Sequence, residues 1–270
     1  MPGRPPHLPE FLNPPVSEVA IGVQFRPPLG YQQIRAGEVW NLYRSDYPNA
    51  EEQSPLPPAF ETFGPPRSQS QPPINFVSGA THDRFWFISE SGAELIQFQD
   101  DRLMHNWREM GLPDNPYPRF EQMIAKFEAE LTELGRYIKG LAPQDLQINQ
   151  CEVTYINTIK VDELPDSRPS TWLRGLEMPT GAVEDFQYVF RRTIRDAKGH
   201  PSGRLTCEAV SAHTRDLEPV IRLTITARGA PPSSKISDAI TYLKQGRDLI
   251  VLGFVEFTTD AAQAHWGRVK

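Results

Sequence analysis

The chain has 270 residues, of which 39% are apolar and 23% charged, and this composition excludes a disordered or fibrous protein. Its net charge of −6 argues against a general nucleic-acid-binding protein, so we expect no duplex nucleic acid among its partners. No apolar run reaches the length of a membrane span, and the first residues lack the apolar centre of a secretory signal. We therefore expect a cytoplasmic protein with no membrane partner.

Of the 27 prolines, 14 lie in two long stretches, at residues 2–15 and 48–73, and two more lie at 231–232. Proline fixes φ and lacks a backbone N–H, so neither stretch is expected to form a regular helix or an inner strand. We interpret residues 1–13 as a proline-rich arm and 46–73 as a proline-rich loop. Two alternatives stay open for the loop, a mobile surface excursion or a polyproline II segment that docks a partner.

The next residues predict strands and two helices. Apolar side chains alternate from Val19 to Phe25, which indicates a strand that Pro27 ends. A short helix is expected at 38–43. Further strands are predicted at 74–78, 84–89, 94–99 and 102–108. From Phe120 to Ile138, apolar residues recur at spacings of three and four, which predicts a long amphipathic helix.

The remaining chain repeats this order of elements. A strand is expected around Leu146–Tyr155, and its apolar phase slips once, which indicates a bulge near Asn149 and Gln150. A short helix is expected at 171–176, and alternating strands at 185–195, 203–213 and 219–228. A last helix is predicted to begin after Ser237 as its N-cap.

These elements predict an α+β protein built from two pseudo-repeated β-α-β-β-β-α halves, residues 14–140 and 141–270. Each half would be an antiparallel sheet packed on a long amphipathic helix, and the sheets would join edge to edge or face to face. A cleft between the halves would then be the natural binding place.

No catalytic, metal or cofactor motif accompanies this pattern. The chain has no Gly-x-Ser-x-Gly elbow and no glycine-rich phosphate loop, and its histidines lack the i,i+4 spacing of zinc ligands on a helix. Cys151 and Cys207 lie in apolar or alternating stretches, so we expect buried free thiols. We predict no metal and no cofactor.

The polar phase of the last three strands is rich in arginine. If these strands are neighbours, their alternate side chains share one sheet face, and arginine binds phosphate or carboxylate with two hydrogen bonds. Two interpretations stay open, a solvent-exposed face or a site for an anionic ligand, phosphorylated or nucleotide-like. The candidate ligand-binding residues are Arg191, Arg204, Arg222, Arg228, Glu208 and His213.

A second candidate is the run Asn106-Trp107-Arg108. On a strand, Trp107 faces opposite to its two neighbours, so we expect Trp107 in the core and Asn106 and Arg108 on the other face. We favour a structural role over a binding role for this motif.

Four segments together resemble a known family. They are Asn13-Pro14-Pro15-Val16-Ser17-Glu18-Val19, the run from Ile96 to Arg108, Gly246-Arg247-Asp248-Leu249-Ile250, and Gly253-Phe254-Val255-Glu256-Phe257-Thr258-Thr259 with Trp266-Gly267. They are similar to uncharacterised prokaryotic proteins of about this length, sporadically distributed among bacteria and archaea. The family's Gly-His-Asp-like triplet has arginine here, at Arg247, so a role built on that histidine does not carry over. The resemblance implies no activity, and the patchy distribution is typical of mobile or defence-linked genes.

Three functions are consistent with the sequence. The first is a non-enzymatic binding protein for a protein partner or a small anionic ligand. The second is an enzyme with His213, Glu208 and Arg222 assembled in a cleft between the halves, as general base, acid and anion clamp. The third is a homo-oligomeric interaction protein that pairs through an open sheet edge.

Overall fold

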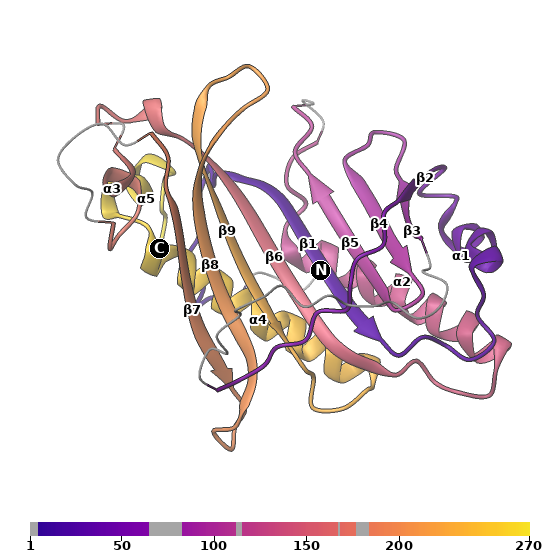
Figure 1. Ribbon diagram of the computed structural model, residues 1–270. Helices are drawn as coiled ribbons and strands as arrows, with labels where there is room; N and C mark the ends of the chain where they lie inside the picture. The colour runs from indigo at the N-terminus through magenta and orange to yellow at the C-terminus, as the bar shows by residue number, and fades with distance from the viewer. Residues whose placement is uncertain (1–4, 65–82, 112–114, 167, 177–183) are drawn as a thin grey trace.

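The computed structural model describes residues 5–64, 83–111, 115–166, 168–176 and 184–270. Its strands are β1 Val16–Phe25, β2 Asn49–Gln53, β3 Arg84–Ile88, β4 Glu94–Gln99, β5 Arg102–Arg108, β6 Ile148–Lys160, β7 Gln187–Arg195, β8 Pro201–His213 and β9 Pro219–Gly229. All nine belong to one antiparallel sheet in the order β2-β3-β4-β5-β1-β6-β9-β8-β7 (Figure 1). The helices are α1 Ala36–Tyr43, α2 Phe120–Leu141, α3 Pro169–Trp172, α4 Ile236–Phe257 and α5 Asp260–His265, with short 3-10 turns at Gln33–Arg35 and Val161–Glu163.

The prediction of two helix-packed halves is wrong, because one continuous sheet contains every strand. β1 lies at its centre and pairs on both sides, with Ile21 opposite His105 of β5 and opposite Val153 of β6. Four strands follow α1 before α2, whereas three strands separate α3 from α4, so the two stretches do not repeat one pattern. A sheet edge needs a partner for its backbone groups, and β1 supplies that partner to strands from both stretches.

Most individual strand predictions agree with the structure. β6 carries the expected bulge, because Gln24 pairs with Gln150 while Phe25 pairs with Ile148, which leaves Asn149 as the extra residue. The predicted strand at 74–78 lies outside the described residues. Three details were wrong. The helix expected at 171–176 is the short α3, which ends at Trp172. Residues 49–53 of the proline-rich loop form the edge strand β2, and α4 begins at Ile236, so Ser237 lies inside the helix and is not its N-cap.

One face of the sheet is covered by α2 and α4, which cross behind it in Figure 1. Alternate strand residues such as Ile21, Val153 and Leu223 point into this layer and are fully buried. Gly246 lets α4 lie close to the sheet, since a Cβ at this position would be 3.3 Å from that of Ala227. The two helices are tied to each other by Arg247, which is 4% exposed and pairs with Glu121 at 2.8 Å.

The N-terminal arm packs against the end of the chain. Leu8 and Phe11 are buried, and Phe11 forms a β-bridge with Arg268. Trp266 stacks on Trp172 and closes this end of the core. Among the described residues, no helix is both long and apolar enough to cross a membrane.

Candidate functional site

The second face of the sheet is polar, and the predicted arginines lie on it. Arg204 of β8 is directly opposite Arg228 of β9, so the structure brings these two together. Arg191 lies opposite Thr206 on the edge strand β7, and Arg222 opposite Val210. Both side chains are exposed and lie apart from the Arg204–Arg228 pair.

The residues predicted for an enzyme do not converge. Glu208 lies opposite Thr224 and accepts a hydrogen bond from the Gln187 side chain at 2.7 Å. His213 is exposed at the end of β8, opposite Pro219. Arg222, Glu208 and His213 therefore follow the sheet surface without enclosing a reaction space.

Residues 54–64, here called the strap, cross this polar face. The strap leaves β2 at one edge of the sheet and runs in front of the strands toward β8 (Figure 1). Thus the described part of the proline-rich loop docks on the protein's own sheet. In the order of the sheet, its contacts run from β4 through β5, β1, β6 and β9 to β8, and so include the Arg204–Arg228 pair.

Two glutamines hold the strap by its backbone. The side chain of Gln24 accepts from the Ala59 N–H at 2.9 Å and donates to the Ala59 carbonyl at 2.6 Å. Gln99 accepts from the Leu56 N–H at 2.9 Å and donates to its carbonyl at 3.1 Å. The two clamped residues are three positions apart, which matches the repeat of a polyproline II helix. A segment rich in proline fits such clamps, because few of its backbone groups need other partners.

Removing both clamps is expected to release the strap. In a Gln24→Ala, Gln99→Ala double variant, the Leu56 and Ala59 amides lose their acceptors, and each lost hydrogen bond costs about 0.5–1.5 kcal/mol. Hydrogen–deuterium exchange should then be about tenfold faster in a strap peptide, since about 1.4 kcal/mol corresponds to a factor of ten. Gln53→Ala is the control, because that side chain bonds only to exposed Glu51. Unchanged strap exchange would contradict the clamping role.

An acidic residue of the strap reaches the predicted arginines. Glu61 forms ion pairs with Arg204 at 2.8 Å and with Arg228 at 3.7 Å, and Arg228 also pairs with Glu152 at 2.5 Å. Burial lowers the pKa of Arg228, but the charges of Glu152 and Glu61 outweigh it and hold this pKa above its ordinary value. The Arg204–Arg228 pair therefore already holds a carboxylate, supplied by the same chain.

A cavity of about 240 Å³ lies between the strap and the sheet. Its lining residues are Gly22, Val23, Gln24, Leu56, Ala59, Arg84, Gln97, Arg102, Met104, Gln150, Cys151, Glu152 and Arg228. Gln150 is only 7% exposed, and its side-chain oxygen is buried without a hydrogen-bond partner among the described residues. A buried, unpartnered amide is costly, and its free oxygen is available to a bound molecule.

Arg84 and Arg102 give the cavity its positive charge. Arg102 is buried, pairs with Asp101 at 2.9 Å and donates to the strap carbonyls of Leu56 and Pro57. Arg84 donates to Gln97 at 2.5 Å and to the Ser54 carbonyl at 3.3 Å, but has no carboxylate partner among the described residues. Burial and the neighbouring charge of Arg102 lower the pKa of Arg84 from its ordinary value. An anion between the two guanidinium groups would relieve this repulsion.

Sequence reasoning missed Arg84, Arg102, Gln150 and Glu61. The alternation on β5 gives Arg102 the same phase as Asn106 and Arg108, so a polar face was readable on that strand. The sequence did not predict the order of the strands in the sheet, and this order places β3, β5, β6 and β9 under one strap.

The Asn106-Trp107-Arg108 run is integrated into the sheet. Trp107 is 2% exposed and packs on Tyr117, with ring centroids 5.1 Å apart. Asn106 donates to Glu18 at 2.6 Å and accepts from Gln97 at 2.9 Å, and Gln97 in turn bonds Arg84. Arg108 donates to the Gly92 carbonyl at 2.9 Å. Asn106 thus fixes the amide that positions Arg84 at the cavity.

Beneath the other face lies a buried polar network that the sequence did not reveal. His105 is fully buried, and its Nδ1 is 3.0 Å from a carboxylate oxygen of Glu130 on α2. Tyr47 donates to the other Glu130 oxygen at 2.6 Å. This network joins β5 and α2 inside the core. None of its residues lines the cavity beneath the strap or contacts the strap.

The remaining predicted chemistry concerns thiols and metals. Cys151 and Cys207 are buried and free, as expected, and burial raises the pKa of both thiols, that of Cys207 to about 12. In the described part of the chain, no group of three or more His, Cys, Asp or Glu side chains is arranged to hold a metal ion.

No protein-family model, curated protein or solved structure matches the chain. The resemblance to a sporadically distributed prokaryotic family therefore stays a prediction. The case for function depends on the geometry of the strap and the cavity.

Proposed function

We propose that the protein is a non-enzymatic cytosolic binding protein for a small anionic ligand, held in the cavity beneath the strap. One observation carries the proposal: three guanidinium groups, of Arg84, Arg102 and Arg228, line this cavity with the single carboxylate of Glu152. Arginine binds phosphate and carboxylate oxygens with paired hydrogen bonds. A cavity of about 240 Å³ between the strap and the sheet favours a small ligand over a protein partner, the other class expected from the sequence.

The size and polarity of the cavity narrow the ligand class. Its volume of about 240 Å³ is slightly below the range of about 300–1,000 Å³ usual for small-molecule sites. A bare phosphate would leave much of it unfilled, so we expect an anion with a polar organic part. Gln150 accepts a hydrogen bond from that part, and Arg84 and Arg102 hold the charge. A phosphorylated sugar meets these requirements.

The strap acts as the cover of this site. Leu56 and Ala59 line the cavity and are the two residues that Gln99 and Gln24 clamp. We expect entry and release of a ligand to involve lifting of the strap at these clamps. The clamp-free double variant should bind and release the ligand faster than the native protein.

Calorimetric titration with ribose 5-phosphate tests the proposal. We expect the native protein to bind this probe and not ribose, since the two differ in the phosphate alone. Arg84→Gln should weaken binding at least tenfold, because a hydrogen bond to a charged group contributes about 1.5–3 kcal/mol. Arg84 is half-buried, so the variant is expected to fold.

The matched control is Arg191→Gln, an exposed arginine of the same sheet face that does not line the cavity. Its affinity for ribose 5-phosphate should equal that of the native protein. Equal losses in the two variants would indicate a diffuse charge effect and contradict a specific site. Equal binding of ribose and ribose 5-phosphate would contradict an anion site.

A further inference from the structure

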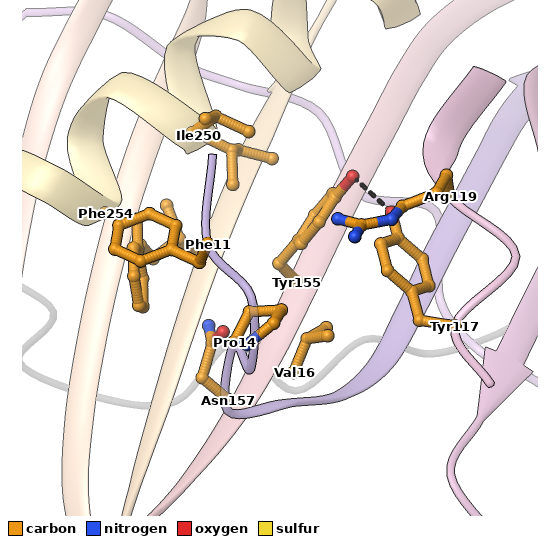
Figure 2. A pocket seen from close by; sticks show the side chains of 11 residues that line it. Phe11, Pro14, Val16, Tyr117, Arg119, Tyr155, Asn157, Ile250 and Phe254 are labelled. Carbon is orange, nitrogen blue, oxygen red and sulfur yellow. Dashed lines mark hydrogen bonds between the residues drawn. The ribbon is translucent and has the colours of Figure 1, made fainter. Parts of the chain in front are cut away.

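A second cavity lies on the opposite, helix-covered face, between the start of α2 and the C-terminal part of α4. Figure 2 shows it beneath Ile250 and Phe254 of α4, with Tyr155 and Asn157 of β6 along its wall and Arg119 beside it. Phe11 of the N-terminal arm and Pro14, which follows the arm, line it on another side. Its volume is about 60 Å³. This cavity shares no lining residue with the one beneath the strap.

The cavity has an apolar body and one polar end. Ile225, Ile250 and Phe254 form apolar walls, whereas Tyr117, Tyr155 and Arg119 supply the polar end. The two tyrosine hydroxyls are 2.8 Å apart and hydrogen-bonded to each other. Burial raises the pKa of Tyr117 well above 10.0, so this phenol stays neutral and provides no negative charge for Arg119.

Arg119 has two unusual properties. Its guanidinium group makes no hydrogen bond or ion pair with any residue that the structure describes. Its backbone has φ 69° and ψ 149°, a conformation that residues other than glycine rarely adopt. Strained residues persist where the surroundings impose them, and they concentrate at ligand sites. In Figure 2 this side chain extends toward Tyr117 and Tyr155, at the polar end of the cavity.

We propose that this cavity binds a short apolar carboxylate, with its carboxylate on Arg119 and its hydrocarbon part between Ile225, Ile250 and Phe254. The negative charge of the ligand is inferred from Arg119, which lacks an anionic partner among the described residues. Its hydrocarbon part is inferred from the apolar walls. The length follows from the volume. On this measure one water needs about 10–15 Å³, so about 60 Å³ accepts roughly four to six non-hydrogen atoms, which is a branched chain of a few carbons and no long acyl chain.

Titration with isovalerate and with its neutral isostere isovaleramide tests this proposal at pH 7, where a carboxylate is ionised. We expect isovalerate to bind at least tenfold more tightly than isovaleramide. Arg119→Gly should abolish this preference and still fold, because glycine adopts the φ of 69° without strain. Arg26→Gly, which replaces an exposed arginine at the end of β1, is the control and should keep the preference.

Two readouts separate this site from the cavity beneath the strap. Arg119→Gly should leave the affinity for ribose 5-phosphate unchanged, and Arg84→Gln should leave that for isovalerate unchanged. The proposal is overturned if no carboxylate from acetate to isovalerate binds more tightly than its amide. It is also overturned if Arg119→Gly and Arg26→Gly weaken isovalerate binding equally.

Discussion

Replacing Glu130 by alanine is expected to lower the free energy of unfolding by about 3–5 kcal/mol, because it leaves His105 buried without its carboxylate partner. Glu130 is 7% exposed, and it accepts hydrogen bonds from Tyr47 and is held against the imidazole of His105. Urea denaturation of the native protein and the variant at pH 7 measures the difference.

The matched control is Glu128→Ala on the exposed side of the same helix, which should change stability by less than about 0.5 kcal/mol. Equal effects of the two variants would mean that the network contributes no more than a surface charge. Burial opposes ionisation of Glu130, but His105, Tyr47 and Lys126 outweigh it and hold its pKa below 4.5. The contribution of this carboxylate is therefore present above pH 4.5 and is lost as the pH falls through the lower folded pKa. The stability gap between the native protein and Glu130→Gln should shrink in that acid range.

Gly203→Ala is expected to destabilise the protein by about 3 kcal/mol through overpacking. Gly203 of β8 lies opposite Gly229 of β9, and the hydroxyl of Tyr242 from α4 lies directly above this pair. A Cβ on Gly203 would collide with that hydroxyl and would lie 2.6 Å from the Arg228 carbonyl oxygen. The backbone oxygen cannot move aside without breaking the sheet. Thermal or urea unfolding measures the loss.

A second substitution shows which contact causes this loss. The Tyr242 hydroxyl is buried and has no hydrogen-bond partner among the described residues. Tyr242→Phe should therefore be nearly neutral alone and should recover part of the stability that Gly203→Ala loses. Gly37→Ala is the control, because a Cβ at this position in α1 meets nothing within 4 Å and should stabilise the helix by about 0.5–1 kcal/mol. If Tyr242→Phe recovered no stability in the Gly203→Ala variant, the whole loss would come from the contact with the Arg228 carbonyl oxygen.

Local patterns predicted the elements well, because their signals lie in adjacent residues. The alternation from Val19 to Phe25 and the three-to-four spacing from Phe120 to Ile138 correspond to β1 and α2. The phase slip at Asn149 located a real bulge. The arrangement was wrong because pairing between distant strands leaves no local signal. A similar order of elements suggested two units, but β1 pairs with β5 on one side and β6 on the other.

The candidate site was predictable only in part. Arg204 and Arg228 share the polar phase of neighbouring strands, and they lie opposite each other as the alternation suggested. Arg84 and Arg102 belong to strands far from these in sequence, and the strap alone brings the four arginines under one cover. The strap itself was hidden because its contacts use backbone carbonyls and amides, which every sequence supplies.

The central position of β1 has a consequence for the order in which the molecule folds. Of the nine described strands, β1 is synthesised before the others, yet both of its partners come much later, since Val19 pairs with Trp107 and then with Tyr155. Pairings between residues so far apart in the chain form slowly, because a long loop must close before any contact is gained. Until β6 is synthesised, a partly made sheet ends at β1, and its free backbone groups form an apolar-backed edge open to other chains. The strand that joins the two parts of the finished sheet is therefore also the strand most exposed to pairing with other chains during synthesis.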